Sequence, residues 1–300
     1  MAASIVGIGY CSWDHLCVLP SIPMDDKVKI ITRAEQGGGP CATAIYAAAK
    51  LGSNCAFMSA AGNDATGDQI VGSLQALHVD TSCIARREAA SPIAYCWVDE
   101  DSGKRSIAWT PGACAPLDPQ TEVNFDIVKH AKILHLDGHQ TQAALAAAKV
   151  ANDNGVLVSI DAGTIVPHID ELLALCDIII MSEKFALNYA HCTDPVNASH
   201  KLFTPGKTRF CGVTMGIRGS YGYDGTTDYF QPSFTVNVVD TTGAGDVYHG
   251  SFCNAIDNGL GWQDAMRQAT MTSALKCTAL GGRTGIPDRK TLEQALKNAR

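Results

Sequence analysis

The sequence has few charges, no cluster of basic residues and no long apolar run. Charged residues make up 18% of the 300 residues, below the roughly 25% that is usual for globular proteins. Hydrophobic residues make up 46%, which predicts a sizeable buried core and excludes a mainly disordered chain. With 23 Lys and Arg against 30 Asp and Glu, the net charge is −7. Nucleic acids and anionic membranes bind cationic patches, so we expect neither as a partner and expect a small molecule instead.

A membrane span, a secretory leader and paired cysteine motifs are also missing. No stretch approaches the roughly 18 apolar residues of a membrane helix, and Asp14 and His15 interrupt the apolar start of the chain. The 12 Cys are scattered without a C-x-x-C pair, which predicts reduced, buried thiols that pack as small hydrophobic groups. The nine His form no H-E-x-x-H string, so we expect no structural zinc. Together these features predict a cytoplasmic protein.

Short apolar strands alternate with helical segments along most of the chain. This alternation is typical of an α/β fold whose mostly parallel sheet is covered by helices on both faces. After residue 240 the pattern is almost entirely helical, and no repeat or linker divides the chain, so residues 1–300 are expected to form one domain. We expect strands at 4–8, 54–59, 132–136, 156–160, 177–181 and 209–214, and helices at 41–51, 66–77, 141–154, 168–175, 244–258, 262–278 and 289–299.

Two segments interrupt the alternation and predict a small extra sheet. Residues 27–34 and 91–110 have a period-two polarity that is typical of strands, and Asp101-Ser102-Gly103 predicts a hairpin turn. The strands form either a lid over the site or an edge extension of the main sheet. A lid with an apolar face would cover the substrate or pair two copies of the chain; its residues are Ile93, Tyr95, Trp97 and Ile107.

The most informative string is D-T-T-G-A-G-D at residues 240–246, between the strand-like 235–239 and a predicted helix. Its small residues at 243–245 let the backbone approach a ligand closely. The start of the following helix offers free N–H groups and the positive end of a dipole, which suits a phosphoryl group. Asp246 in the first turn is placed to take a proton from an attacking hydroxyl, although a capping role is the simpler alternative.

This string resembles the C-terminal signature of the ribokinase-like (PfkB) carbohydrate kinases. A second resemblance, to the family's N-terminal signature, covers G-G-G-P at 37–40, L-G at 51–52 and A-G-N-D-A-T-G at 61–67. V-T-M-G-I-R-G at 213–219 is similar to the family's nucleotide segment. The matches follow the family's order over residues 7–287 and look most like the sulfofructose kinases and nearby sugar kinases. The resemblance implies a Rossmann-like, three-layer α/β domain with a β-sheet lid.

The resemblance also implies a function and its residues. It implies an ATP-dependent kinase that phosphorylates a hydroxyl of a small sugar, with Asp246 as general base. The anion hole would comprise Gly243, Ala244 and Gly245. Asp14, Gly38 and Gly39 would contact the sugar. ATP would lie near Ser182, Thr214, Gly216 and Gly219. Asp240 matches a position near the monovalent-cation site of some members, where K⁺ would bind.

Several positions depart from the family pattern. Thr43 stands where many members carry a substrate-binding Asn. S-E-K-F at 182–185 replaces N-x-x-E, which leaves Glu183 as a weak candidate for Mg²⁺ and favours Mg²⁺ held mainly by ATP and water. Lys27 is either a basic substrate contact or a solvated lid residue. Trp109 and His139 replace the Asn and Arg expected around a sulfonate, which removes a planar fork for an oxyanion, so a sulfosugar is not expected. Trp109 stacks on a sugar or packs in the hairpin, and His139 is a candidate substrate contact.

Two other functions remain open on the same fold. A nucleoside kinase would need an aromatic wall for the base, for which the sequence offers Trp13, Tyr95 and Trp109. A non-catalytic sugar- or nucleotide-binding regulator is suggested by the changes at 182–185, but the intact Asp246 with its G-A-G string argues against it.

Overall fold

The computed structural model describes residues 2–101 and 105–299 and contains a nine-stranded main sheet. Its strand order is β13-β12-β11-β10-β9-β8-β1-β4-β5. The strands from β11 to β5 run parallel, and β12 and β13 pair antiparallel at one edge. The predicted α/β fold with a mostly parallel sheet is confirmed. The strands are β1 Ile5–Ile8, β4 Cys55–Gly62, β5 Ile84–Arg87, β8 Ile133–Leu136, β9 Leu157–Ala162, β10 Ile178–Ser182, β11 Phe210–Thr214, β12 Ser220–Tyr223 and β13 Asp228–Gln231.

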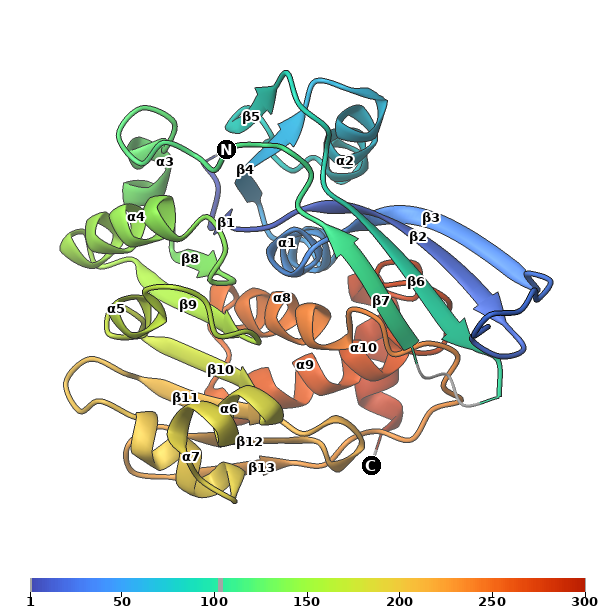
Figure 1. The fold of residues 1–300 in the computed structure, drawn as a ribbon. Helices are drawn as coiled ribbons and strands as arrows, with labels where there is room; N and C mark the ends of the chain where they lie inside the picture. The colour runs from blue at the N-terminus through green and yellow to red at the C-terminus, as the bar shows by residue number, and fades with distance from the viewer. Residues whose placement is uncertain (1, 102–104, 300) are drawn as a thin grey trace.

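Helices bury both faces of the main sheet, which explains the continuous apolar strands (Figure 1). In β1, Val6 and Ile8 belong to the cluster that includes α4 (Thr141–Asp153), whereas Ile5 packs with α1 (Pro40–Lys50). Successive strand side chains point to opposite faces, so a strand covered on both sides must be apolar throughout. The other helices are α2 Ala65–Gln75, α3 Phe125–His130, α5 Ile169–Leu173, α6 Glu183–Ala190, α7 Pro195–Leu202, η1 Gly216–Arg218, α8 Ala244–Asp257, α9 Trp262–Lys276 and α10 Arg289–Asn298.

A separate four-stranded sheet forms the lid and projects from the main body on the right of Figure 1. Its order is β3-β2-β6-β7, with β2 at Ser12–Leu19, β3 at Thr32–Gly38, β6 at Ile93–Asp99 and β7 at Arg105–Thr110. β2 pairs parallel with β6, and the outer pairs are antiparallel. The predicted hairpin at 91–110 contains β6 and β7, whereas Ser102 and Gly103 of its predicted turn lie outside the described residues.

The other half of the lid differs from the prediction. The strand predicted at 27–34 begins too early, because residues 27–31 belong to the loop between β2 and β3, where Ile30 and Ile31 are exposed. β2 was not predicted. The face of β2 that is most buried begins with the polar residues Ser12 and Asp14, and these interrupt the apolar alternation that marks a strand.

The segment 235–239 is also not the strand that its Val residues suggest. Val238 and Val239 are 54% and 46% exposed. The chain reaches α8 along the end of α9 instead, where the N–H groups of Val239 and Asp240 donate to the carbonyl of Cys277 at 2.8 and 3.2 Å. This contact places the D-T-T-G-A-G-D loop against the C-terminal end of α9.

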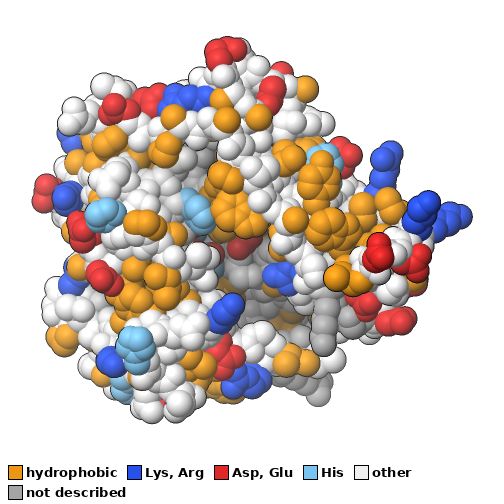
Figure 2. Space-filling view, in the orientation of Figure 1, with side chains coloured by type: hydrophobic (Ala, Val, Ile, Leu, Met, Phe, Trp, Pro, Cys, Tyr) orange, Lys and Arg blue, Asp and Glu red, His pale blue; other side chains and the backbone are white. Residues whose placement is uncertain are grey.

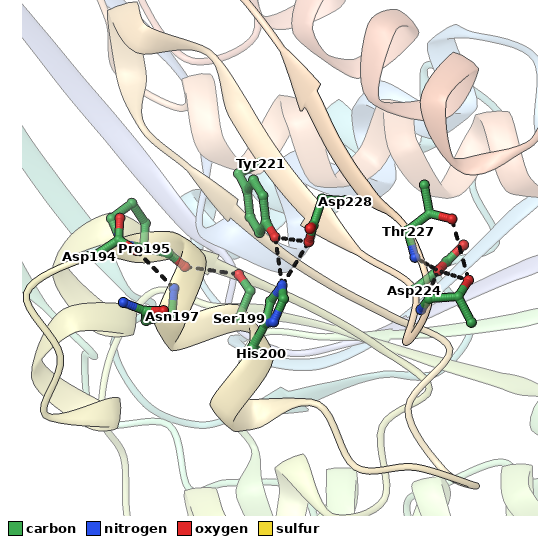
Figure 3. Close-up of polar contacts among 10 residues, drawn as sticks. Asp194, Pro195, Asn197, Ser199, His200, Tyr221, Asp224, Thr227 and Asp228 are labelled. Atoms are coloured by element: carbon green, nitrogen blue, oxygen red, sulfur yellow. Dashed lines mark hydrogen bonds and ion pairs between the residues drawn. The ribbon is translucent and has the colours of Figure 1, made fainter.

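Polar side chains fasten α7 to the outer edge of the main sheet (Figure 3). His200 Nε2 lies 2.9 Å from the Tyr221 hydroxyl of β12 and 2.7 Å from Asp228 Oδ1 of β13. Asp228 also accepts a hydrogen bond from Tyr221. Asp194 caps α7 by accepting the Asn197 N–H at 3.1 Å. These contacts hold a short helix over an antiparallel edge and stabilise the fold.

No helix within residues 2–101 and 105–299 has the length and hydropathy needed to cross a membrane. The cysteines are free thiols, and most of them are buried. Burial raises the pKa of the Cys176 and Cys211 thiols, so these side chains stay protonated and pack as small hydrophobic groups.

Close packing of α8 on α1 yields a stability prediction. A Cβ atom on Gly250 would lie 2.0 Å from the carbonyl oxygen of Ala44, so we expect Gly250→Ala to push the helices apart and lower the free energy of unfolding by about 1–3 kcal/mol. Gly72→Ala in α2 is the matched control, because its Cβ would meet open space and should raise stability by about 0.5–1 kcal/mol. Equal urea midpoints for the two variants would contradict the predicted packing.

Candidate active site

A cavity of about 550 Å³ lies where the lid meets the C-terminal ends of the main strands. Figure 2 shows the molecular surface hollowed there, beside apolar side chains that gather over the lid. The main body contributes Tyr10 after β1, Asp137 after β8, Asp161 in β9, Ser182 in β10 and Thr214 in β11. Open α/β sheets bind ligands at this edge. The lid contributes Ser12, Asp14, Ala94, Cys96, Arg105, Ile107 and Trp109.

The N-terminus of α8 faces this cavity. Its N-cap, Gly243, has a left-handed φ of 72°, and a Cβ there would lie 2.9 Å from the Cα of Gly282. Gly243 and Gly245 line the cavity, whereas the N–H of Ala244 donates to the carbonyl of Thr241 at 3.2 Å. Of the three residues predicted for the anion hole, Gly243 and Gly245 are thus the two at the cavity.

Asp246 shares the cavity with a second carboxylate, Asp161. His249, one turn after Asp246 on α8, places Nε2 3.2 Å from Asp161 Oδ1. Burial opposes ionisation of Asp161, but the contact with His249 outweighs it and lowers the pKa of Asp161. Burial, and next the negative charge of Asp161, raise the pKa of Asp246 from 3.8 to about 7, against the opposing effects of His249 and Arg105. Asp246 can therefore gain or lose a proton near neutral pH.

Asp14 lies on the lid side of the cavity, on β2. Asp14 is 8% exposed, and its Oδ1 accepts a hydrogen bond from Ser12 Oγ at 2.7 Å. Burial raises the pKa of Asp14, and the Ser12 bond and the charge of Arg283 partly offset that rise. A Cβ on Gly38 would lie 2.0 Å from Asp14 Oδ2. Gly38 therefore makes room for the Asp14 carboxylate.

Arg283 is 4% exposed and links the elements behind Asp14. Its guanidinium donates to Thr43 Oγ1 at 3.3 Å, to Ser73 Oγ at 3.1 Å and to the carbonyl of Gly38 at 3.2 Å. Thr43, predicted as a substrate contact, is thus an acceptor for Arg283, is 2% exposed and is not among the described residues that line the cavity.

Aromatic rings gather at the mouth of the cavity, between the main body and the lid. The ring of Tyr10 lies 5.7 Å from that of Trp109, edge to face, and 5.2 Å from that of His139. The Tyr10 hydroxyl donates to the carbonyl of Thr110 at 3.2 Å. Burial lowers the pKa of His139, but the neighbouring Asp137, 3.4 Å from Nδ1, outweighs burial and raises it. Trp109 and His139 both line the cavity.

Arg105 joins the lid to the loop before α8. This lid residue lines the cavity, and its Nη1 donates to Thr241 Oγ1 at 2.8 Å. A guanidinium is a favoured partner for phosphate. The contact brings a cation from the lid to the segment that precedes Gly243.

The family assignment rests on nearly the whole chain. The sequence profile described as pfkB family carbohydrate kinase matches residues 2–289. This chain belongs to the pfkB family of carbohydrate kinases. It is therefore a phosphotransferase, as its signature strings predict.

Relatives of this kinase cover both its sequence and its fold. The ATP-dependent ribose-1-phosphate kinase of Halopiger xanaduensis is 27% identical over 252 residues, which are 83% of each chain. A solved structure of a putative ribokinase from Agrobacterium tumefaciens superposes with a TM-score of 0.92, 25% identity, and coverage of 99% of this chain and 98% of the other. The structure of Arabidopsis thaliana ribokinase complexed with ribose and ATP gives a TM-score of 0.85, 25% identity and 99% coverage of both chains.

The other predicted site residues of the kinase lie outside the cavity lining, with the exception of Gly39. Lys27 is exposed in the loop between β2 and β3 and is not among the described residues that line the cavity. Glu183 forms an ion pair with Arg218. Gly216 is the first residue of η1 and Gly219 follows its last, and neither is among the described residues that line the cavity. Gly219 has a φ of 92°, and a Cβ there would lie 2.0 Å from the carbonyl of Gln231. Gly39, with a φ of 88°, lines the cavity.

Asp240, predicted near a monovalent cation, is fully buried at the start of the loop that leads to α8. Its Oδ1 accepts hydrogen bonds from the N–H and the hydroxyl of Thr242 at 2.8 and 2.7 Å. Its Oδ2 accepts the Gly281 N–H at 2.8 Å, and its carbonyl accepts a hydrogen bond from Lys276 Nζ at 2.8 Å. Both carboxylate oxygens and the carbonyl oxygen thus have donors from within the chain.

Three residues that line the cavity were not predicted from the sequence: Arg105, Asp161 and His249. Two local signals point to the last pair: Asp161 lies near the carboxyl end of an apolar strand, and His249 follows Asp246 by three positions, which is the same face of a helix. Arg105 carries no such signal, because only the folded lid brings it to Thr241.

The electrostatics of Asp246 predict a pH dependence. A general base must be deprotonated, so with Asp246 in the role that the sequence predicts for it, kcat/KM should rise with pH through about 7, where the pKa of Asp246 lies. Asp161→Asn removes a charge that opposes ionisation of Asp246, so the rising limb of the plot of kcat/KM against pH should move to lower pH. Asp25→Asn, an exposed lid-loop change at a φ of 55° that Asn also adopts, is the control. A limb that stays in place or moves up in Asp161→Asn would contradict this assignment.

Proposed function

We propose that this kinase transfers the γ-phosphoryl group of ATP to a hydroxyl of a small neutral sugar bound beneath the lid. The observation that carries the proposal is one cavity holding Asp246, the N-terminus of α8 and Asp14. A base, an anion site and a sugar-binding carboxylate are the parts that phosphorylation of a sugar needs. A relative of the same fold, the Arabidopsis ribokinase, was solved with ribose and ATP.

The carboxylates that line the cavity favour a neutral acceptor. Asp14 and Asp161 line it together with Asp246, and carboxylates accept hydrogen bonds from hydroxyl groups. Arg105 is engaged with Thr241, and Lys27 is exposed outside the lining. An anionic group on the sugar would lie close to these carboxylates, with few cations nearby to offset the repulsion. The backbone at Gly39 and the ring of Trp109 complete the sugar contacts in this proposal.

Asp246 accepts the proton of the attacking hydroxyl as that oxygen forms its bond to phosphorus. The bond from phosphorus to the bridging oxygen of ADP breaks in line with the attack. The N–H groups of Gly243 and Gly245 stabilise the negative charge on the transferring phosphoryl oxygens. A carboxylate whose pKa is about 7 is a stronger base than an ordinary Asp yet is partly deprotonated at neutral pH.

The residues present do not build a cage for Mg²⁺. Among the described residues, no three His, Cys, Asp or Glu side chains group together in a way that would hold a metal ion. Glu183, the predicted ligand, is engaged by Arg218. Mg²⁺ commonly keeps several waters and binds substrate phosphates, so we propose that it enters with ATP and that Glu183 is not its ligand.

A nucleoside is the second candidate acceptor. The rings of Tyr10, Trp109 and His139 meet at the mouth of the cavity. Such a wall stacks on a nucleobase as readily as on the apolar face of a sugar. Tyr95, named with Trp109 for this role, instead stacks on His15 at 5.0 Å and is 47% exposed.

Pairing of two copies through the lid remains a prediction. Tyr95 and Ile107 are each 47% exposed on the lid sheet. An apolar lid surface is consistent with either an intermolecular contact or a cover for substrate.

An acceptor screen tests the proposed reaction. ADP release should be stimulated by one or more neutral pentoses, hexoses or ketoses, and less by sugar phosphates, sulfosugars or sugar acids, because the acceptor site is rich in carboxylates. A nucleoside that outcompetes every free sugar would establish the second candidate instead. A preference for an anionic sugar would contradict the proposed acceptor class.

Asp246→Asn tests the base. Loss of a general base should lower kcat by about 10²- to 10⁴-fold, while the melting temperature stays equal or rises, because the repulsion between Asp246 and Asp161 is removed. Steady-state rates and thermal melting of this variant and of Asp25→Asn provide the measurement. An Asp246→Asn enzyme with ordinary activity would refute the role of Asp246.

A further inference from the structure

Lys276 is a fully buried lysine in the last turn of α9. It lies directly behind residues 240–243, the loop that leads to the proposed anion site at the start of α8. Its side chain has 0% exposure, and its ammonium donates to the carbonyl oxygen of Asp240 at 2.8 Å. Burial of an ammonium is strongly unfavourable unless acceptors and negative charge surround it. A lysine in such a place indicates a definite role for its charge.

The surroundings of Lys276 are built around Asp240. The Asp240 carboxylate is held by the backbone of Thr242 and Gly281, so its charge is fixed beside the lysine. The N–H groups of Val239 and Asp240 donate to the carbonyl of Cys277, the residue after Lys276. α9 and the 239–242 segment are thus joined by several hydrogen bonds, and the ammonium lies among them.

This arrangement makes Asp240 a poor site for a free monovalent cation. Both carboxylate oxygens and the carbonyl of Asp240 already accept hydrogen bonds. A bound K⁺ would also lie beside a second buried positive charge, and buried like charges repel strongly. The residues of this chain therefore do not fit the K⁺ site that the family resemblance implies.

We propose that the Lys276 ammonium is a built-in substitute for that cation. Its charge and its bond to Asp240 fix the loop that leads through Thr241 and Thr242 to Gly243, so that the N–H groups of α8 hold their direction toward the phosphoryl group. Lys276 is a positioning residue that acts through Asp240, and its effect on turnover rests on the proposed anion site. The enzyme then needs no monovalent cation.

The first test uses the unaltered enzyme. MgATP affinity by calorimetry, melting temperature and turnover are measured in KCl, NaCl and tetramethylammonium chloride at equal ionic strength. We expect the same values in the three salts. A saturable rise of ATP affinity, melting temperature or turnover with K⁺ would overturn the proposal. Because calorimetry and melting need no acceptor, they remain informative even if the proposed sugar reaction fails.

The second test removes the charge and keeps most of the volume. Lys276→Met should weaken MgATP binding or lower kcat by about 10-fold or more, yet less than the 10²- to 10³-fold cost of losing a direct oxyanion donor. K⁺ should restore part of the loss, whereas tetramethylammonium, which is too large, should not. A structural role in packing would not produce this cation selectivity.

Lys297→Met is the matched control, because Lys297 is an exposed lysine in the last turn of α10. It removes the same charge and should leave MgATP affinity and turnover unchanged. A Lys276→Met variant that melts cooperatively and behaves like Lys297→Met would overturn the proposal. If Lys276→Met does not fold, the salt comparison on the unaltered enzyme still decides whether this chain uses K⁺.

Discussion

One buried carboxylate, Asp137, fixes the geometry at the edge of the sheet where the cavity lies. Its two oxygens accept the backbone N–H groups of Tyr10, Cys41 and His139 at 2.8, 3.1 and 2.9 Å. These donors come from the end of β1, the start of α1 and the loop after β8, so a single side chain joins three segments that are distant in sequence. β2 begins just beyond Tyr10, and the position of Asp14 therefore depends on the same contact.

The carboxylates around the cavity differ in their hydrogen-bond partners, and we expect their roles to differ accordingly. Asp137 and Asp240 accept backbone N–H groups and hold loops in place. Burial raises the pKa of Asp14 and of Asp246, because it disfavours their charged forms. A carboxylate that is fully hydrogen-bonded within the chain has little to offer a ligand, whereas one that is poorly solvated binds hydroxyls or takes protons strongly.

The main sheet could be predicted from sequence because its strands are apolar on both faces and alternate with amphipathic helices. The lid could be predicted only in part, since a strand that lines a polar site carries Ser12 and Asp14 where a core strand would carry apolar residues. The opposite error arose where apolar residues suggested a strand that the structure lacks. These residues are exposed in irregular segments: Ile30, Ile31, Val238 and Val239. The motif at 240–246 identified Asp246 and its loop, but Arg105 and Lys276 reach that loop only through tertiary contacts, which no local pattern encodes.

In the proposed function, those two cations would supply positive charge to a phosphate site in a chain with a net charge of −7. Lys276 lies behind the loop on α9, and Arg105 reaches the same loop from β7. Trp109 is on β7 as well, and Asp14 is two strands away in the same sheet. Because Arg105 already donates to Thr241, the lid sheet is joined to the loop before α8, and Asp14, Trp109 and Arg105 share one hydrogen-bonded sheet. A sugar that contacts this sheet would therefore be coupled to the position of the Arg105 charge, and such coupling would limit transfer of the phosphoryl group to water.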